Sequence, residues 1–343
     1  MFCSIIPDDI LKKLKDKKSL ETSEQIRNIR AATVVLKKAS KVPIPGDHDE
    51  VRVLYDAHNT EVLNQDVSNI IEVDYEQDHK NTDGSIELEM FDKTYDFFLQ
   101  KLGMESYDNR DAIWKIFMHY GKQYNNAFWN GNAFVFGDAD QVFFRTFWIQ
   151  DVSTHEAMHA VTGYVTQLVY QGQSGALNEH ISDVLGICCN HFLGNNSWVI
   201  GEGIWMPYIS GKGLRTFTLE PAYDDPILGK DGQPKHMKDL YIGIKDNGGV
   251  HINSGILNHA FYSFVYRSGK KPFEEPLNIW WKAIQKTRAF DDFAAFAWNT
   301  IDVTEDSELK GHLLAAWSDV GIIPKKKKWT FWDTVRLFLL RYH

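Results

Sequence analysis

Two histidines stand four residues apart in the run HEAMH at residues 155–159. Residues at this spacing project from one face of an α-helix, so both imidazoles can turn toward one ion, as two corners of a zinc tetrahedron require. Glu156 lies about 100° further round such a helix and can act as a general base toward a water at the metal. The same pattern also arises by chance on ordinary helices, so it needs support from the rest of the chain.

A second pair of side chains, Glu179 and Asp183, is also four residues apart, in the run GALNEHISD at 175–183. Glu179 would supply a third protein ligand and leave the fourth position open for water, as a catalytic zinc requires. Asp183 would accept the other ring N–H of a ligand histidine and fix its tautomer. The alternative is that these acids only cap or solvate a helix, but the matching spacing of two histidines and two acids favours a metal site.

The composition is that of a soluble globular protein with room for two lobes. The 343 residues are 43% hydrophobic and 24% charged, and the net charge of −9 argues against a nucleic-acid partner. No apolar run is long enough to span a bilayer.

The start, MFCSIIPDDILKKLKDKK, places apolar residues before basic ones, the reverse of a secretory signal. We therefore expect synthesis in the cytoplasm and any export by a non-classical route. Three cysteines cannot form a disulfide framework and match no zinc-thiolate spacing.

Apolar periodicity divides the chain into a strand-rich and a helical part. A charged helix is predicted over 8–40, followed by a linker rich in proline and acids at 41–50. Strands are predicted at 51–59, 67–75, 112–121 and 132–138, with one helix that ends at Gly103. Helices are predicted at 151–170, 175–193, 252–267, 276–286 and 308–320. The expected fold is α+β, with a strand-rich lobe over 49–150, a helical lobe over 151–323 and the HEAMH run at their junction.

Three separated motifs resemble those of the thermolysin-like zinc metallopeptidase family. They are YNNAFWNG at 124–131, the HEAMH and NEHISD pair over 155–183, and DNGGVHINSGI at 246–256. They occur in the family's order, and the resemblance covers residues 50–323. It implies a two-lobed zincin fold and hydrolysis of peptide bonds, with one Zn²⁺ per chain. The matched zinc ligands are His155, His159 and Glu179, the general base is Glu156, and Asp183 lies behind a ligand histidine.

The same resemblance implies a group of residues that stabilises the oxyanion of the tetrahedral intermediate. His251 and Tyr170 match the hydrogen-bond donors, and Asp246 matches the carboxylate that orients the histidine. Taken alone, His251 would more often be a structural histidine. Donors aimed at a developing oxyanion contribute about 3–4 kcal/mol each.

Substrate-binding residues are implied as well. Asn126 and Ala127 match groups that hold the peptide backbone, beside an edge strand expected at 132–137, and Arg215 falls where the family binds a substrate carbonyl. The residues that match the specificity pocket are all apolar: Val152, Ile200, Ile204 and Leu214. Cleavage on the amino side of large hydrophobic residues is therefore expected.

A departure from the family concerns its double calcium site. Asp151 and Glu202 keep an acid at two of the matched positions, whereas Asn190, Ser197 and Val199 are neutral. Calcium prefers anionic oxygen ligands, so we expect the double site to be lost, and a single calcium ion stays open.

Both ends of the chain suggest functions of their own. Residues 1–48 look like the short propeptide of the protealysin-like group within the family, blocking the cleft until they are removed. The alternative is an N-terminal helix that is simply part of the fold. Cys3 could reach the zinc in such a precursor, although a buried apolar cysteine is the commoner case.

Residues 324–343 place an apolar stripe behind four lysines, which suits a membrane surface or a partner groove as well as a helix docked on its own domain.

The sequence therefore predicts a zinc-dependent neutral endopeptidase made as a precursor, acting on peptide or protein substrates and expected to be a monomer. A zinc aminopeptidase is one alternative, because such enzymes also combine HExxH with a downstream glutamate. A non-catalytic zinc-binding scaffold that acts through its C-terminal tail is another.

Overall fold

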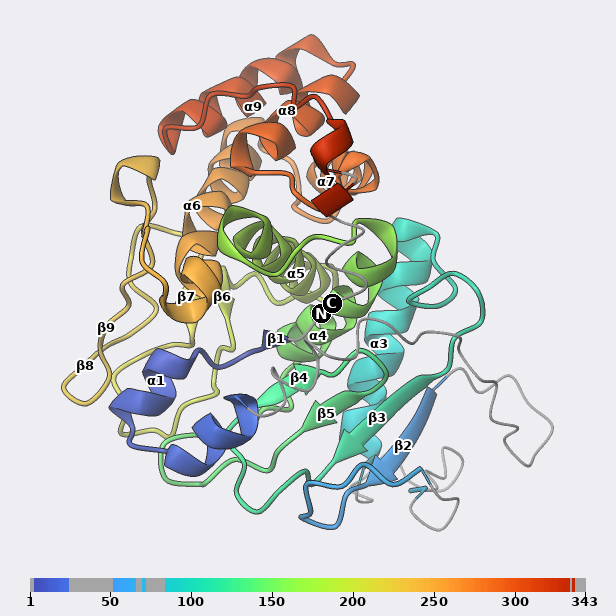
Figure 1. Ribbon diagram of the computed structural model, residues 1–343, viewed down its shortest axis with the longest axis vertical. Coiled ribbons are helices and arrows are strands. Elements are labelled where there is room, and N and C mark those ends of the chain that lie inside the picture. The colour runs from blue at the N-terminus through green and yellow to red at the C-terminus, as the bar shows by residue number, and fades with distance from the viewer. Residues whose placement is uncertain (1–2, 25–51, 66–69, 72–83, 334, 337–343) are drawn as a thin grey trace.

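The computed structural model describes residues 3–24, 52–65, 70–71, 84–333 and 335–336 (Figure 1). Most strands of the first half of the chain join one sheet, and the chain after residue 150 is mainly helical. In Figure 1 the sheet lies below, the later helices lie above, and α4 and α5 lie between them. The prediction of an α+β fold with a strand-rich part followed by a helical part is confirmed.

Among the described residues, the main sheet has five strands in the order β1-β4-β5-β3-β2. β2 (Arg52–Asp56), β3 (Trp114–Met118) and β5 (Phe134–Phe136) run parallel to one another. β4 (Ala127–Trp129) forms an antiparallel hairpin with β5, and β1 (Cys3–Ser4) pairs antiparallel with β4. The first residues of the chain thus complete a sheet whose other strands come from residues 52–136.

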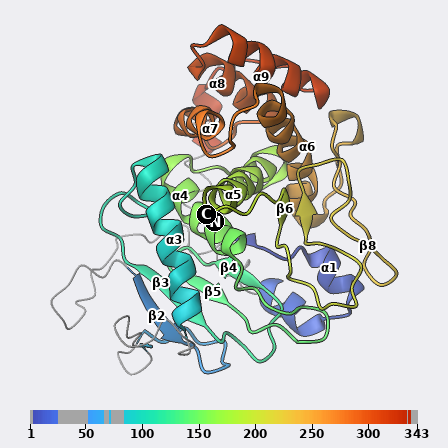
Figure 2. The ribbon, with the colours of Figure 1, turned by 180° about the vertical axis from the view of Figure 1, so that it is seen from behind.

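Helix α3 (Ser85–Leu102) covers one face of this sheet, as Figure 2 shows from behind. The Phe91 ring meets Trp114 and Phe136 edge-on, with centroids 6.1 and 5.8 Å apart. The helix ends at Gly103, whose φ of 68° suits glycine and whose N–H donates to the Leu99 carbonyl. The predicted stop at Gly103 matches the structure.

The centre of the molecule is the pair α4 (Gln150–Val165) and α5 (Gly172–Phe192). Every residue from 151 to 162 is buried, so α4 presents no polar face to solvent along this stretch. Gly186 of α5 allows the close approach, because a Cβ there would lie 2.8 Å from the Asp151 carbonyl oxygen. Polar side chains on two such enclosed helices need partners inside the protein.

The remaining helices and small sheets surround this pair. α6 packs on α5, and α7 to α9 extend the helical part beyond it (Figure 1). The helices are α6 (Lys245–Ser268), α7 (Glu275–Lys286), α8 (Phe293–Val303) and α9 (Ser307–Asp319), with a 3-10 turn at Met237–Asp239. Two-stranded sheets join β6 (Val199–Ile200) to β7 (Arg215–Thr216) and β8 (Asp224–Asp225) to β9 (Gly229–Lys230). Within the described residues, no helix is both long and apolar enough to cross a bilayer.

The predicted continuous helix over 8–40 is wrong in its first part. α1 (Asp8–Lys13) stops, Lys15 takes a φ of 58°, and the chain is helical again from 17 to 24. The reason is local, because the Asp16 carboxylate accepts the Ser19 N–H and starts a new helix there. Residues 25–40 and the predicted linker at 41–50 lie outside the described residues.

Other predictions for strands and helices also differ from the structure. The strand nearest the cleft is β4, not the segment at 132–137, because β5 lies inside the sheet between β4 and β3. α4 ends at Val165 instead of 170, since the chain turns at Gln167 with a φ of 55°. α8 was not predicted, because its sequence is apolar on most sides and shows no amphipathic period. Of the predicted strand at 67–75, only Ile70 and Ile71 are described, and Ile70 pairs with Tyr55.

Candidate metal centre and peptide cleft

His155, His159 and Glu179 meet between α4 and α5, and their side chains are fully buried. The two Nε2 atoms lie 2.9 Å apart. The Glu179 carboxylate oxygens lie 3.6 Å from His155 Nε2 and 3.5 Å from His159 Nε2. Neighbouring ligand atoms of a tetrahedral zinc ion, with bonds of about 2.0–2.1 Å, lie about 3.3 Å apart. The two imidazoles and the carboxylate, which offers a different oxygen to each histidine, therefore already lie close to the spacing that a zinc ion needs.

The outer ring nitrogens of both histidines have partners that orient the rings. His155 Nδ1 lies 2.9 Å from Asp183 Oδ1. His159 Nδ1 lies 2.7 Å from Asn178 Oδ1 and 3.1 Å from Ser182 Oγ. Oxygen acceptors at Nδ1 place the ring proton there and leave Nε2 with a lone pair for a metal. Sequence reasoning gave no role to Asn178 and Ser182, although each directly precedes a residue that it named, Glu179 and Asp183.

The charge of the centre depends on a balance between burial and neighbouring groups. Burial lowers the pKa of His159 to about 3, against the raising effect of Glu179. Burial would raise the pKa of Glu179, but His251, His159 and His155 outweigh it and lower the value to about 2. A neutral imidazole and an ionised carboxylate are the forms that bind zinc.

Glu156 points from α4 toward the sheet. Its side chain is fully buried, and Oε2 accepts the Trp129 N–H from β4 at 2.8 Å. This contact ties the carboxylate to the strand that borders the cleft. Nothing in the local sequence of β4 indicated it, because the two residues are 27 positions apart.

His251, Tyr170 and Asp246 form a group beside Glu179, with His251 Nε2 3.5 Å from Glu179 Oε2. Tyr170 OH donates to Glu179 Oε1 at 2.6 Å and lies 3.3 Å from His251 Nε2. Asp246 holds the histidine twice, accepting its backbone N–H at 2.8 Å and contacting Nδ1 at 2.6 Å. Burial lowers the pKa of His251, but the carboxylates of Asp246 and Glu179 outweigh it and raise the value to about 9.

The first turn of α6 explains how Asp246 reaches back to His251. Residues 246–249 all have positive φ, between 48° and 82°, so the chain makes a left-handed turn before the regular helix begins. Gly248 and Gly249 adopt this conformation without the penalty that a Cβ brings. The glycines of the DNGGVH run thus allow the turn that brings the Asp246 carboxylate to His251.

Arg215 lies on β7 and is buried beside the metal centre. Its Nε and Nη2 donate to the Asp183 carboxylate at 2.8–3.1 Å, and Nη1 donates to the Ile5 carbonyl oxygen at 3.2 Å. Burial would raise the pKa of Asp183, but Arg215 and His155 outweigh it and hold the pKa well below its usual range. One guanidinium therefore contacts both the acid behind His155 and a peptide carbonyl.

Residues 3–6 of the chain occupy the cleft as an extended peptide. Ile5 N–H donates to the Ala127 carbonyl at 3.0 Å, and Ile6 N–H donates to Asn126 Oδ1 at 2.9 Å. The Asn126 amide donates back to the Ile6 carbonyl at 3.3 Å. His251 Nε2 lies 3.1 Å from the Ser4 carbonyl oxygen. Both residues that the sequence named beside the cleft therefore contact a peptide backbone in this structure.

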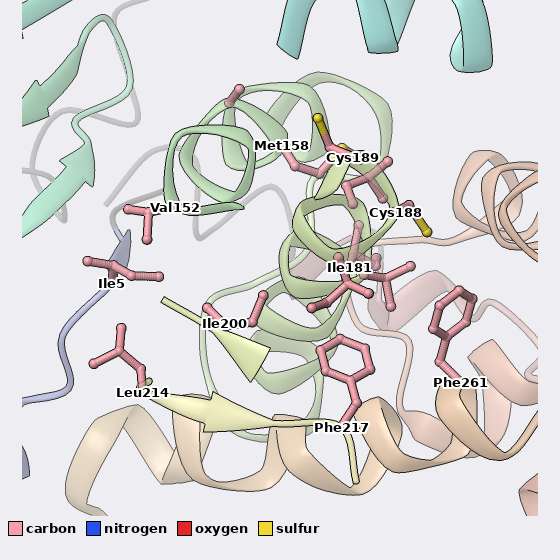
Figure 3. Packing of buried hydrophobic residues seen from close by; sticks show 14 of the residues in the cluster. Ile5, Val152, Met158, Ile181, Cys188, Cys189, Ile200, Leu214, Phe217 and Phe261 are labelled. Atoms are coloured by element: carbon pink, nitrogen blue, oxygen red, sulfur yellow. The ribbon is translucent and has the colours of Figure 1, made fainter. Parts of the chain in front are cut away.

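The Ile5 side chain fills an apolar pocket, where Figure 3 shows it between Val152 and Leu214 with Ile200 nearby. Ile5, Val152, Ile200 and Ile204 are fully buried and Leu214 is 4% exposed. Three of the four apolar residues predicted to line a specificity pocket thus lie around one bound aliphatic side chain. The Cys3 side chain lies outside what the structure describes.

Asp151, at the other end of the same helix pair, has neutral partners. Its carboxylate accepts the Gly201 N–H at 3.1–3.2 Å and the Asn190 amide at 3.1 Å. Burial raises the pKa of Asp151 to about 7, against the lowering effect of the Gly201 hydrogen bond. Glu202 is exposed, and the positions of Ser197 and Val199 offer no carboxylate. N–H donors on both oxygens of the one buried acid do not fit a double calcium site.

Comparison with known proteins gives matches along nearly the whole chain. Residues 16–163 match the family model described as thermolysin metallopeptidase, catalytic domain. Residues 166–322 match the model described as thermolysin metallopeptidase, alpha-helical domain. Together the two models span the described cleft and both helices of the metal centre.

Individual relatives agree with the family models. Protease PrtS of Photorhabdus sp. (strain Az29) is 37% identical over 293 residues, covering 80% of this chain and 77% of that protein. An extracellular metalloprotease of Pectobacterium carotovorum subsp. carotovorum is 40% identical over 243 residues, covering 67% and 70%. Thermolysin of Alicyclobacillus acidocaldarius is 45% identical over 170 residues, which are 49% of this chain and 30% of that protein.

A solved structure is similar over almost its full length. The precursor of protealysin, a metalloproteinase from Serratia proteamaculans, superimposes with a TM-score of 0.78 at 36% identity. The match covers 93% of this chain and 99% of that structure. The two proteins therefore share one fold over nearly the whole length of each chain.

Proposed function

The chain belongs to the thermolysin family of metallopeptidases and is a metalloendopeptidase of the protealysin-like group, and on that premise we propose how its cleft works. It is a zinc-dependent neutral endopeptidase made as a precursor, whose own residues 3–6 occupy the cleft before maturation. The observation that carries this proposal is the set of backbone hydrogen bonds that Ile5 and Ile6 make with Ala127 and Asn126.

His155, His159 and Glu179 would hold the zinc ion, and Asp183 and Asn178 would keep the two imidazoles in place. When bound, zinc polarises the scissile carbonyl and acidifies a water. Glu156 takes the proton of the attacking water and delivers it to the amine that leaves, so the peptide bond breaks and the proton count balances. The Trp129 N–H aims the Glu156 carboxylate for this task.

His251 and Tyr170 would stabilise the oxyanion that forms when water adds to the carbonyl. Support comes from the Ser4 carbonyl oxygen, which lies 3.1 Å from His251 Nε2 in the peptide now bound. Asp246 keeps the imidazole oriented through Nδ1. Removing one such donor typically costs about 2.7–4 kcal/mol of transition-state stabilisation.

The bound segment also supports a specificity. Ser4 has its carbonyl at His251 and Ile5 has its side chain in the apolar pocket, which supports the Ser4–Ile5 bond as the equivalent of the bond cut in a substrate. Arg215 and Asn126 hold the carbonyls of Ile5 and Ile6. A substrate bound in the same way is cleaved on the amino side of a large hydrophobic residue.

The test is hydrolysis of an internally quenched peptide that is blocked at both ends and carries one leucine or isoleucine. The form that begins near residue 49 should cleave it on the amino side of that residue, a zinc chelator should stop the reaction, and Glu156→Gln should lower kcat/KM by about 10²–10⁴-fold. Cleavage only of peptides with a free amino end would identify an aminopeptidase instead. Zinc binding without any cleavage would identify a binding scaffold.

The precursor part of the proposal has its own test in the full-length chain. Ile5→Asp places a charge in the apolar pocket and should raise initial activity toward that of the form lacking residues 1–48. The matched variant Ile5→Val keeps an apolar side chain and should stay inhibited. Full activity of the unprocessed wild-type chain would show that residues 3–6 do not block the cleft.

A further inference from the structure

The chain continues past residue 322, where the family match ends, and contacts the start of α8 and the loop between α7 and α8 (dark red in Figure 1). The Lys325 N–H donates to the Ala294 carbonyl at 2.9 Å. The Trp329 ring lies on Phe290 with centroids 6.1 Å apart, and the Arg288 guanidinium lies 5.6 Å from the Trp329 ring. The start of the C-terminal tail, residues 324–343, therefore has a fixed place on the domain.

Directly after this anchor, two large rings face outward. Phe331 and Trp332 are each 74% exposed, and their centroids are 5.9 Å apart. Thr330 and Asp333 exchange side-chain and backbone hydrogen bonds at 2.7–3.2 Å, which fixes the turn that carries the rings. The aromatic pair is thus presented by ordered backbone.

The tail differs from the rest of the chain in charge. It holds four lysines and two arginines against one aspartate, a net charge of +5 in a protein whose total is −9. The four lysines are consecutive, at 325–328, and all are exposed, although Lys327 Nζ also donates to the Phe290 carbonyl oxygen. Charge and exposed aromatic surface therefore coincide within eight residues, from 325 to 332.

We propose that the C-terminal tail docks the protein on an anionic lipid surface. The lysines at 325–328 contact the negatively charged headgroups, and Phe331 and Trp332 enter the boundary between headgroups and acyl chains. Aromatic rings, tryptophan above all, are the side chains that prefer this boundary, and clusters of four or more basic residues recognise anionic lipids.

A lipid surface fits this chemistry better than a protein groove does. Protein interfaces are depleted of lysine, which is a flexible and strongly hydrated point charge suited to mobile headgroups. Docking needs no span, in agreement with the absence of a long apolar helix among the described residues. The proposal goes beyond the peptidase activity and does not depend on it.

The experiment is co-sedimentation of the full-length protein with vesicles. Mixed phosphatidylcholine and phosphatidylglycerol vesicles should bind it, pure phosphatidylcholine should bind it far more weakly, and added salt should reduce the difference. Phe331→Ser with Trp332→Ser should weaken binding at least roughly tenfold for each ring. Lys325→Gln with Lys326→Gln should weaken it about fivefold for each lysine.

Matched controls lie elsewhere on the surface. Tyr266 is 78% exposed, so Tyr266→Ser removes an aromatic ring of similar exposure, and Lys270→Gln with Lys271→Gln removes two exposed lysines. Neither control should change vesicle binding, and all variants should keep the wild-type unfolding temperature. Failure to bind anionic vesicles, equal binding to neutral vesicles, or equal loss in the controls would overturn the proposal.

Discussion

The two ends of the α4–α5 pair treat a buried carboxylate in opposite ways. At one end Glu179 lies among His155, His159 and His251, and its pKa is lowered to about 2. At the other end Asp151, one helical turn before His155, accepts hydrogen bonds from Gly201 and Asn190, and its pKa is raised to about 7. Both side chains are fully buried, so burial alone does not distinguish them.

The difference lies in the partners. Burial disfavours an ionised carboxylate by an amount that only cations or several strong donors can offset. Three imidazoles surround Glu179, whereas neutral amides donate to Asp151, and the Arg215 guanidinium lowers the pKa of both carboxyls. The end at Glu179, here called the metal end, can hold an ionised carboxylate and a metal ion. The end at Asp151, here called the brace end, links α4 to α5 through the hydrogen bond between Asp151 and Asn190. The predictions below test that contrast.

The largest effect is expected from Glu179→Gln at the metal end. The variant loses an anionic ligand, so zinc content should fall below one per chain and kcat/KM should fall by more than about 10⁴-fold. Zinc analysis of the purified protein together with peptide hydrolysis measures both. Asn190→Ala at the brace end is the control and should keep its zinc, and equal zinc loss in both variants would break the contrast.

Asp183→Asn should have a smaller effect, because Asp183 acts through His155 and Arg215. A lost partner behind a metal ligand typically lowers metal affinity or activity about 10–100-fold. Competition with a coloured chelator gives the zinc affinity, and kcat/KM gives the activity. A variant with wild-type values for both would show that the Asp183 charge is not needed.

Asp151 should make folding stability depend on pH. Its folded pKa of about 7 exceeds the ordinary value of 3.8, so the folded state holds the proton more tightly than the unfolded state does. The contribution is therefore present below the unfolded pKa and is lost as pH rises from about 4 to about 7, by up to about 1.4 kcal/mol per pH unit. The difference in unfolding free energy between the wild type and Asp151→Asn, measured across this range, should show the slope, and a flat difference would contradict it.

The smallest effect is expected from calcium. Because Asp151 is already satisfied by amide donors, the unfolding temperature of the wild-type protein should be the same in calcium and in a calcium-selective chelator. Asn190→Asp replaces the donor with a second buried acid, so it should lower stability and make it respond to calcium. Calcium-dependent stability of the wild type would show that the brace binds a cation after all.

Much of the metal centre follows from local sequence. The spacing of His155 and His159, and of Glu179 and Asp183, already places each pair on one helical face, and the structure has helices at both places. The end of α3 at Gly103 could likewise be predicted from nearby residues alone. The continuous helix over 8–40 failed, because the Asp16 side chain starts a second helix where apolar spacing alone shows no break.

Other features needed contacts between distant residues. β4 is only three residues long, and its place at the cleft depends on pairing with β5 and β1. The Asn178 contact with His159 joins residues 19 positions apart, and the hydrogen bonds of Ile5 and Ile6 join positions more than 100 apart. Periodicity carries no information about such pairs.

The amino-acid sequence by itself determined the helices of the metal centre and the donor atoms they present, because helical spacing brings residues four apart together without help from the rest of the fold. The motifs in the sequence also determined the family to which the chain belongs. Tertiary structure decided which carboxylate is charged, which strand borders the cleft and which residues of the N-terminal segment fill it. Those outcomes depend on the solvent exclusion and the partners that only the assembled protein supplies.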